Sequence, residues 1–563
     1  MMLTQDIGSP EAVSAINPDY ASEPLSAFLR RQDEWSLPNV LRSRASERPD
    51  APALQFENGE VLSYRQLLAK VETLAANLVA MGVARGDRVA LIMDNSSEMV
   101  VAWYAINAAG GVEVPVNTAL RGKFLAHVLE NSSAKIVIAD GHLMEPLVEI
   151  RSDARHVERL ILNGEPKVAS PWATVELPGL MAACEAADLE RVRALTIGHD
   201  DAAAIMYTSG TTGPAKGVLL SHGHMCAWAR QMCDALRLRD DDTFLVVLPL
   251  FHGNAQIMQV YAATMAGAKT ALYRRFSTSR WVDQAIESGA TVSSLLGVMA
   301  QFIFDQEQSE KDALIPISRM ITIPMPAAIG DRFRKRFNLE CIEAYGMTEI
   351  CLPLMQRLEG EKRAGSCGRP LDEWFEVAVV DPATDRLLPP NTVGEIVVRP
   401  KHPWTMMLEY FKMPDRTVKA WRNLWFHTGD SGKYDEDGYF YFADRLQDRI
   451  RRRGENISSY ELEAVAAEFD GVLEAAAVAV PADEGDDDIK LCVVTRDGSL
   501  DHMAFLDHCR KNMAYFAVPR YFCVFQEFPK TPNGKVLKRE LRESDGLSRW
   551  DRVAAGITIR RDS

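Results

Sequence analysis

The sequence of 563 residues lacks the features that mark several classes of protein. Its nine cysteines form neither a CxxC pair nor a cluster with histidine, so we expect reduced thiols in the core rather than a disulfide framework or a zinc site. Residues 1–24 contain no apolar signal segment, and no stretch reaches the roughly 20 apolar residues of a membrane span. The last residues, Arg561-Asp562-Ser563, form no peroxisomal address. These absences favour a cytoplasmic protein.

A surplus of basic charge is also missing. The chain has 63 lysines and arginines against 78 aspartates and glutamates, which gives a formal net charge of −15. This balance argues against nucleic acid or an anionic membrane as the main partner. With 47% hydrophobic and 25% charged residues, the composition is that of a globular protein, and a chain of this length buries about three quarters of its unfolded surface.

The first part of the chain alternates short apolar runs with helical patterns. An apolar run at 88–94 is followed by a helix that Ser96 caps and that continues through Ala109. Further strands are expected at 112–116, 135–139, 202–207 and 243–248. Alternating strands and helices predict an α/β fold, in which helices cover both faces of parallel sheets.

The composition changes near Asp444, where arginines crowd into a short stretch. Residues 458–461 form a capping box, and Ile457 and Leu462 are spaced as a hydrophobic staple, so a helix should begin there. We expect an α+β unit of about 100 residues after this point. The predicted organisation is an N-terminal arm (1–24), a large domain (25–444), a hinge (445–448), a C-terminal domain (449–541) and a tail (542–563).

The strongest chemical signal is a loop directly after an apolar strand. It reads Tyr207-Thr208-Ser209-Gly210-Thr211-Thr212-Gly213-Pro214-Ala215-Lys216-Gly217. Its glycines and hydroxyl residues offer many N–H and O–H donors, which suit a polyphosphate, and the lysine adds positive charge. Gly217 stands where a kinase-type phosphate loop needs Ser or Thr, so that alternative is excluded.

From about 37 to 541 the sequence resembles the adenylate-forming superfamily, which includes acyl-CoA synthetases, stand-alone adenylation domains and beetle luciferases. The motifs occur in the family's order: the loop above, Phe251-His252-Gly253-Asn254, Tyr345-Gly346-Met347-Thr348-Glu349, Thr428-Gly429-Asp430, Asp444-Arg445 with Arg453-Gly454-Glu455-Asn456-Ile457, and Pro529-Lys530-Thr531-Pro532-Asn533-Gly534-Lys535. The resemblance implies doubly wound sheets plus a distorted β-barrel in the large domain and a small mobile α+β C-terminal domain.

The resemblance also assigns nucleotide-binding residues. Tyr345 is expected to stack on adenine, Thr348 to bind the α-phosphate, and Asp430 and Arg445 to hold the ribose. Thr208 and Glu349 would bind Mg²⁺, which prefers oxygen ligands. The full nucleotide set is Thr208, Ser209, Gly210, Thr211, Thr212, Gly213, Lys216, Ala344, Tyr345, Gly346, Met347, Thr348, Asp430 and Arg445.

Catalytic and coenzyme A roles follow from the same resemblance. Lys535 would stabilise the charge that develops as pyrophosphate leaves, and His252 would form a wall of the acid pocket. Arg453 and Gly454 are assigned to coenzyme A, although the arginines at 449–453 are equally compatible with a solvated face. The remaining expected pocket residues are Trp228, Met232, Met258, Met299 and Met325.

Two positions depart from the family pattern. The family often has a Gly-Gly-Ala-Pro type segment before the adenine motif, and this sequence has Ile323-Pro324-Met325-Pro326-Ala327 there. The resemblance therefore does not assign the backbone conformation or the floor of the acid pocket at this segment. Gln447 stands at the hinge, where lysine or aspartate is common.

These features predict an ATP-dependent carboxylic acid–CoA ligase that forms an acyl adenylate and uses ATP, Mg²⁺ and coenzyme A. The alternatives are a stand-alone enzyme that loads an acyl or amino acid onto a carrier protein, a binding protein without chemistry, and a luciferase-like oxidation, which the sequence favours least. In the pocket strand before His252 and near Cys226, no aspartate stands where amino acid activators hold the ammonium group. We expect small-molecule partners, allow for a homodimer, and note a weak similarity to the crotonobetaine/carnitine–CoA ligase branch at 251–256 and 453–459.

Overall fold

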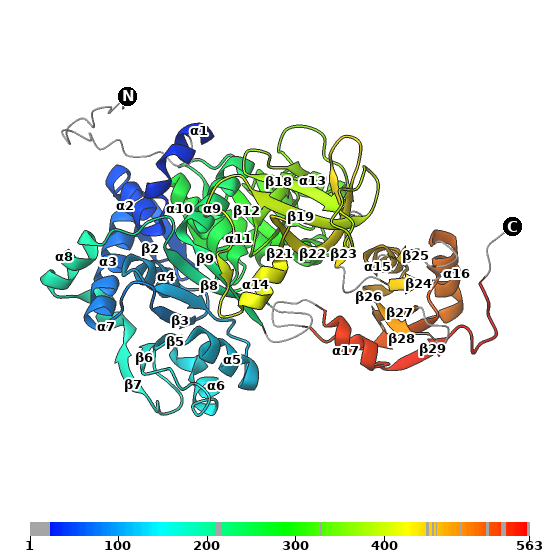
Figure 1. Ribbon diagram of the computed structural model, residues 1–563, viewed down its shortest axis with the longest axis horizontal. Helices are drawn as coiled ribbons and strands as arrows, with labels where there is room; N and C mark the ends of the chain where they lie inside the picture. Colours follow the sequence, from blue (N-terminus) through cyan, green and yellow to red (C-terminus); the bar gives the residue numbers. More distant parts are fainter. Residues whose placement is uncertain are drawn as a thin grey trace, which may run out of the picture.

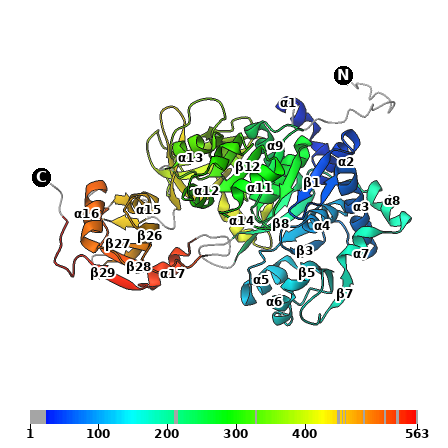
Figure 2. The ribbon, with the colours of Figure 1, turned by 180° about the vertical axis from the view of Figure 1, so that it is seen from behind.

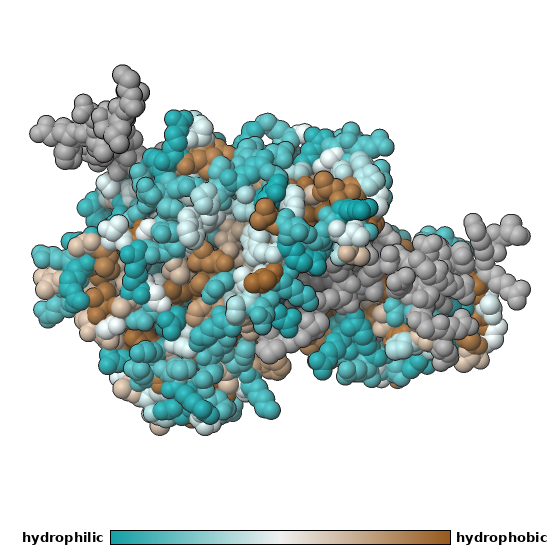
Figure 3. All heavy atoms as spheres, viewed as in Figure 1, coloured by the Kyte–Doolittle hydropathy of each residue, from teal (hydrophilic) through white to brown (hydrophobic). Residues whose placement is uncertain are grey.

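The computed structural model describes residues 23–208, 215–326, 329–445, 450–452, 455–457, 459–482, 487–513, 517–530 and 536–559. Figure 1 shows a large N-terminal body of sheets and helices, with the C-terminal unit at one end, and Figure 2 shows the same arrangement from behind. In the face shown in Figure 3, hydrophobic residues form scattered patches in a mainly hydrophilic surface. None of the helices in the described ranges is both long and apolar enough to cross a membrane.

The first large sheet has the strand order β20-β9-β8-β4-β3-β5-β6-β7. The strands from β8 through β4, β3, β5 and β6 to β7 are parallel to one another. The β8–β9 and β9–β20 pairs are antiparallel. The strands are β3 (Arg88–Ile92), β4 (Val112–Pro115), β5 (Ile136–Asp140), β6 (Arg159–Asn163), β7 (Ala173–Glu176), β8 (Ala202–Thr208), β9 (Lys216–Ser221) and β20 (Glu409–Tyr410).

The second large sheet has the order β14-β13-β12-β10-β11-β1-β2 and is parallel except for its last pair. Its strands are β1 (Pro52–Phe56), β2 (Val61–Ser63), β10 (Thr243–Val246), β11 (Lys269–Leu272), β12 (Val292–Leu296), β13 (Arg319–Ile323) and β14 (Glu340–Ile342).

A layer of helices lies between the two sheets and shares one hydrophobic core with both. It consists of α2 (Leu37–Glu47), α3 (Tyr64–Ala80), α4 (Ser97–Ala108), α9 (His222–Leu236), the π-helix η3 (Asn254–Tyr261) and α10 (Ala262–Ala266). Helix α4 begins where Ser96 Oγ accepts a hydrogen bond from the Met99 amide at 3.1 Å. Its residues are buried on all sides because it is apolar around its whole circumference.

Other helices cover the outer faces of the sheets. Helices α5 (Gly122–Ser132) and α6 (Met144–Glu149) pack on the first sheet. Helices α11 (Trp281–Ser288), α12 (Gly297–Phe304) and α13 (Gly330–Phe337) pack on the second. Each sheet is therefore doubly wound, as the alternation of strand and helix predicts. The remaining helices are α1 (Leu25–Phe28), η1 (Leu29–Glu34), η2 (Gly141–Leu143), α7 (Leu177–Ala182), α8 (Ala186–Ala194), η4 (Glu310–Leu314) and α14 (Pro414–Ala420).

Smaller antiparallel sheets complete the large body at the position where the family resemblance implies a distorted barrel. One has the order β15-β16-β17, and the other has β18-β19-β22-β21 with β23 paired to β22. Their strands are β15 (Ala344–Met347), β16 (Cys351–Met355), β17 (Arg369–Pro370), β18 (Phe375–Val380), β19 (Gly394–Pro400), β21 (Trp421–Arg422), β22 (Trp425–Tyr434) and β23 (Phe440–Arg445).

The C-terminal unit has its own hydrophobic cores around the sheet β26-β27-β28-β29. Helix α15 begins at Ser459, and the expected staple residues Ile457 and Leu462 are both buried. Part of the proposed capping box, Ser458, lies outside the described residues. The elements are β24 (Ile450–Arg452), β25 (Glu455–Ile457), α15 (Ser459–Ala467), β26 (Val472–Pro481), β27 (Asp487–Thr495), α16 (His502–Asn512), β28 (Tyr521–Phe525), α17 (Lys538–Glu543) and β29 (Ser548–Asp551).

Strand β29 comes from the segment that the sequence assigned to a tail. It pairs antiparallel with β28, and the indole of Trp550 stacks on Phe522 with ring centroids 5.4 Å apart. The backbone bonds and this aromatic contact place residues 548–551 in the sheet of the C-terminal unit.

Candidate functional site

Strands β8 and β9 form a hairpin whose connecting loop carries the glycine- and hydroxyl-rich motif. Residues 209–214 lie outside the described residues, so the two ends of the loop define its position. Thr208 pairs with Lys216 across the hairpin, and the imidazole Nε2 of His127 on α5 lies 2.9 Å from the carbonyl oxygen of Ala215. The hairpin thus holds both ends of the expected phosphate loop at one edge of the first sheet.

Tyr410 connects this hairpin to the expected metal-binding carboxylate. Strand β20 runs antiparallel to β9, and the Lys216 ammonium lies 4.1 Å from the centre of the Tyr410 ring. The phenol of Tyr410 donates a hydrogen bond of 2.9 Å to Glu349 Oε1, and both side chains are buried. A charge-assisted hydrogen bond of this kind fixes the orientation of the carboxylate.

The expected adenine and ribose residues also meet. The Tyr345 hydroxyl donates a hydrogen bond of 2.8 Å to Asp430 Oδ2, and the Tyr345 ring stacks on Phe442 with centroids 6.2 Å apart. Asp430 pairs with Arg445 between β22 and β23, so their backbones are adjacent. Burial and the Asp430 carboxylate raise the pKa of the Tyr345 phenol, which therefore remains a hydrogen-bond donor.

The backbone around Tyr345 is closely packed. A Cβ atom on Gly346 would lie 2.1 Å from the carbonyl oxygen of Cys351, so only glycine fits there. Ala344 is buried, whereas Met347 and Thr348 are partly accessible on the same segment. Burial raises the pKa of the preceding Glu343 to about 7, although the Met325 amide donates to its Oε2. No motif in the sequence pointed to Glu343.

His252 lies at the turn that precedes η3. Burial lowers the pKa of its imidazole to about 4, so the ring is neutral at physiological pH. Nothing in the described part of the chain hydrogen-bonds to its buried Nε2 atom. A Cβ on the next residue, Gly253, would lie 2.8 Å from the Trp228 ring and 3.5 Å from Met206 Sδ. The indole of Trp228 thus packs directly against the backbone beside His252.

The five expected pocket residues divide between two cores. Trp228, Met232 and Met258 belong to the core between the sheets, and Met325 belongs to the core on the outer face of the second sheet. Met299 packs against both cores. The segment that departs from the family pattern contains a cis Ile323–Pro324 peptide bond.

Several expected site residues cannot be placed. Lys535, Gln447, Arg453 and Gly454 lie outside the described residues, as do Ser209, Gly210, Thr211, Thr212 and Gly213. Arg445 is described through its backbone only. Their roles stay predictions.

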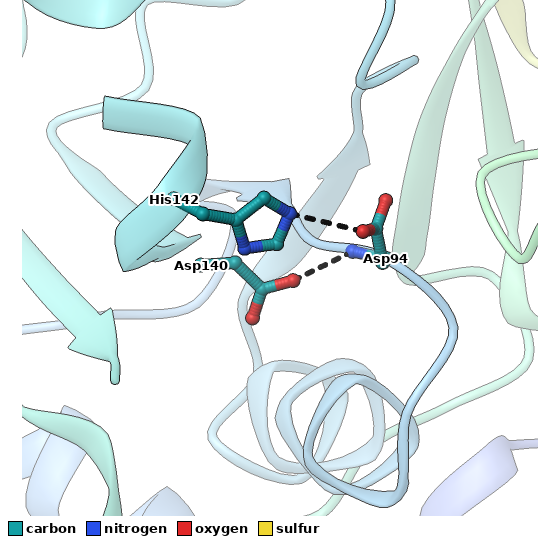
Figure 4. A group of neighbouring side chains, drawn as sticks. All are labelled: Asp94, Asp140 and His142. Carbon is teal, nitrogen blue, oxygen red and sulfur yellow. Dashed lines mark hydrogen bonds and ion pairs between the residues drawn. The ribbon is translucent and has the colours of Figure 1, made fainter. Parts of the chain in front are cut away.

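A separate group of possible metal ligands follows β3 and β5 (Figure 4). His142 Nε2 lies 3.0 Å from Asp94 Oδ2, and the Asp94 amide donates to Asp140 Oδ2 at 2.8 Å. Asn163 donates to the other oxygen of Asp140. These bonds already link the ends of three neighbouring strands, and the group contains none of the expected site residues.

The fold and this arrangement of nucleotide-site motifs define the chain as a member of the AMP-binding enzyme family. The family's main model matches residues 41–411, and the model of its C-terminal domain matches residues 461–535. The predicted family and fold class are confirmed.

Among curated proteins, the crotonobetaine/carnitine–CoA ligase of Salmonella paratyphi A is 32% identical over 508 residues, covering 88% of this chain and 96% of the relative. Among solved structures, ATP-bound MatB from Rhodopseudomonas palustris is 27% identical with a TM-score of 0.80, covering 91% of this chain and 98% of that one. The o-succinylbenzoate CoA synthetase MenE from Bacillus subtilis, in complex with its acyl-adenylate intermediate, is 25% identical with a TM-score of 0.77 and the same coverage.

Proposed function

We propose that the protein is an ATP-dependent carboxylic acid–CoA ligase of the AMP-forming class. The acid's carboxylate attacks the α-phosphorus of ATP, which gives an acyl adenylate and releases pyrophosphate. The thiol of coenzyme A then attacks the acyl carbon, forms the thioester and releases AMP. The carboxylate oxygen that attacked phosphorus leaves with AMP, and the thiol proton passes to solvent.

The observation that carries this proposal is the hydrogen bond between Tyr345 and Asp430. It joins the expected adenine motif to the expected ribose motif, although the two residues are far apart in the sequence. Relatives whose names include CoA ligase, and solved structures with ATP or an acyl adenylate, share this fold over most of both chains. They support the same two-step reaction for this protein.

Mg²⁺ would be held by Glu349 and Thr208. The oxygen donors of both side chains fit a hard cation, and Tyr410 orients the Glu349 carboxylate. The ion would neutralise phosphate charge as the α-phosphorus is attacked. The chain's own part is to fix the Glu349 carboxylate through Tyr410 and to hold the Lys216 ammonium over the Tyr410 ring.

The C-terminal domain would serve both half-reactions in turn. We assign Lys535 to pyrophosphate departure, and Arg453 and Gly454 to the coenzyme A channel, with rotation about a hinge at 445–448 centred on Gln447. The large domain would span 25–444. We extend the C-terminal domain beyond 541 to include β29, because this strand belongs to its sheet.

The acid itself is proposed only as a small-molecule carboxylic acid, without a chain length. The relatives named for crotonobetaine and carnitine make acids of that kind worth including among the candidates. Loading of a carrier protein is the competing function. Cytoplasmic location and a homodimer stay predictions from the sequence.

Pyrophosphate release across a panel of carboxylic acids, with and without coenzyme A, tests the proposal. We expect acid-dependent pyrophosphate and AMP in equal amounts, with a thioester of free coenzyme A as the product. Acid-dependent pyrophosphate without any thioester would favour carrier loading. No acid-dependent release would contradict an adenylate-forming function.

A further inference from the structure

A buried glutamate lies in the layer between the two sheets. Glu113 on β4 is fully buried. Its Oε2 accepts a hydrogen bond of 2.9 Å from Gln256 Nε2 on η3. Within the described ranges, Glu113 Oε1 and Gln256 Oε1 have no hydrogen-bond partner. Each of these two hydrogen-bonded side chains therefore keeps one buried oxygen atom without a partner in the described ranges.

Such a pair is costly unless a donor or a cation reaches it. Burial raises the pKa of Glu113 well above its usual range, and only the Gln256 hydrogen bond opposes this shift. The same layer contains a contrasting acid, Glu72 on α3, whose oxygens contact Arg42 at 3.3 Å and Arg193 at 2.8 Å. The chain thus pairs Glu72 with its own arginines, whereas burial favours the neutral acid form of Glu113 and no arginine or lysine in the described ranges is paired with it.

The position of Glu113 follows from strand register. Glu113 pairs with Ala204 on β8, and Met206 lies two residues farther along the same face. Ala204 and Met206 belong to the core between the sheets, whereas Val112 and Val114 face the opposite core. Glu113 therefore points into the layer that contains α9 and η3.

A continuous line of contacts leads from His252 to this acid. Met206 and the Trp228 ring both lie against Gly253, next to His252. The Gln256 amide donates to the His252 carbonyl at 3.0 Å, so the Gln256 side chain starts one helical turn beyond His252. From there it reaches Glu113. Gln256 thus links the backbone at His252, the expected carboxylate position, to the buried side chain of Glu113.

The backbone of η3 adds a second unusual feature to the same place. It is a π-helix, a rare conformation that occurs frequently at functional sites. Gln256 lies in its first turn, and the buried Trp228 indole packs against Gly253, just before this turn.

We propose that Glu113 and Gln256 form the inner end of the acyl pocket and bind a cationic nitrogen at the remote end of the carboxylic acid substrate. This inference rests on the proposed function, because it extends the acid site of that reaction. The cation would contact the two oxygen atoms that lack a partner and would stabilise the ionised form of Glu113.

Matched acids test the inference in the full-length enzyme. Each ω-amino acid with a chain of three to six carbons is compared with the fatty acid in which methyl replaces ammonium. A trimethylammonium acid is compared with the isostere in which carbon replaces nitrogen. We expect kcat/KM for pyrophosphate release to favour the cationic member by about 10- to 100-fold at the best length. The trimethylammonium pair distinguishes a need for charge from a need for N–H donors.

The variant Glu113→Gln removes the charge and keeps the shape. We expect it to lose the cationic preference by about 10-fold or more while the methyl acids react at least as well as in the parent. Glu72→Gln is the matched control, since it changes a buried acid that already has arginine partners, and its preference should equal that of the parent.

Two outcomes would overturn the inference. One is a parent enzyme that favours the methyl acids at every length, and this outcome requires no variant. The other is a Glu113→Gln enzyme that retains the cationic preference. In both cases pyrophosphate is still released, so the proposed function stands. Absence of release with every acid of a wider panel would instead contradict the proposed function.

Discussion

Removing the Tyr410 hydroxyl should impair adenylate formation through Glu349. In Tyr410→Phe the aromatic ring remains, so the contact with Lys216 at 4.1 Å is preserved. The hydrogen bond of 2.9 Å to Glu349 Oε1 is lost. The change therefore separates orientation of the carboxylate from packing of the ring.

The size of the effect follows from burial. Tyr410 and Glu349 are 4% and 3% exposed, so water does not replace the lost donor easily. A hydrogen bond to a charged group contributes about 1.5–3 kcal/mol, which corresponds to about 10- to 100-fold in rate or affinity. We expect a loss of this size in kcat/KM for adenylation and a higher Mg²⁺ concentration at half-maximal ATP binding.

The assay is pyrophosphate release over a Mg²⁺ titration, together with calorimetric binding of ATP at each Mg²⁺ concentration. Tyr434→Phe is the control, because it removes a hydroxyl that donates to the Leu388 carbonyl at 3.0 Å away from the site. Thioester formation from supplied acyl adenylate should be unchanged in both variants. An unaltered Mg²⁺ dependence in Tyr410→Phe would refute the role given to this tyrosine.

Three further substitutions separate the steps of the reaction. Asp430→Ala should raise the KM for ATP strongly and leave acid binding almost unchanged, because ribose contacts exist in ground and transition states alike. An unchanged KM in a steady-state ATP titration would remove Asp430 from the nucleotide site. Lys535→Ala should lower adenylation by about 100-fold or more while transfer from supplied acyl adenylate survives; equal losses in separate assays of the two steps would indicate a structural role. Gln447→Pro should impair transfer to coenzyme A more than single-turnover adenylation, because proline fixes φ near −65° at the hinge. Gln447→Ala should change both rates only slightly, and transfer at the parental rate in the proline variant would place the hinge elsewhere.

Local pattern was sufficient to predict much of the fold. The helix after Ser96 and the strands around it depend on capping and on short apolar runs, and both are visible in adjacent residues. The start of α15 followed in the same way from its staple residues. Strand β29 was missed because its place depends on pairing with β28 and on the Trp550–Phe522 contact, which local sequence does not encode.

The site residues likewise fall into those that local motifs identify and those that only the three-dimensional structure reveals. Tyr345 and Asp430 were identified because they occur in recognisable motifs, and the structure adds the bond that joins them. Tyr410 was missed because it stands on a two-residue strand whose neighbour, β9, is distant in the sequence. Glu113 did leave a signal, since a lone acid in an apolar strand is unusual, but its partner Gln256 became evident only in three dimensions.

The central claim is that the substrate carboxylate attacks the α-phosphorus of ATP. Turnover of an acid labelled with oxygen-18 in its carboxylate, followed by mass spectrometry of the nucleotide product, tests this claim directly. The account predicts AMP that carries one labelled oxygen, together with unlabelled pyrophosphate. Label in inorganic phosphate with ADP as the product, or AMP without label, would contradict it.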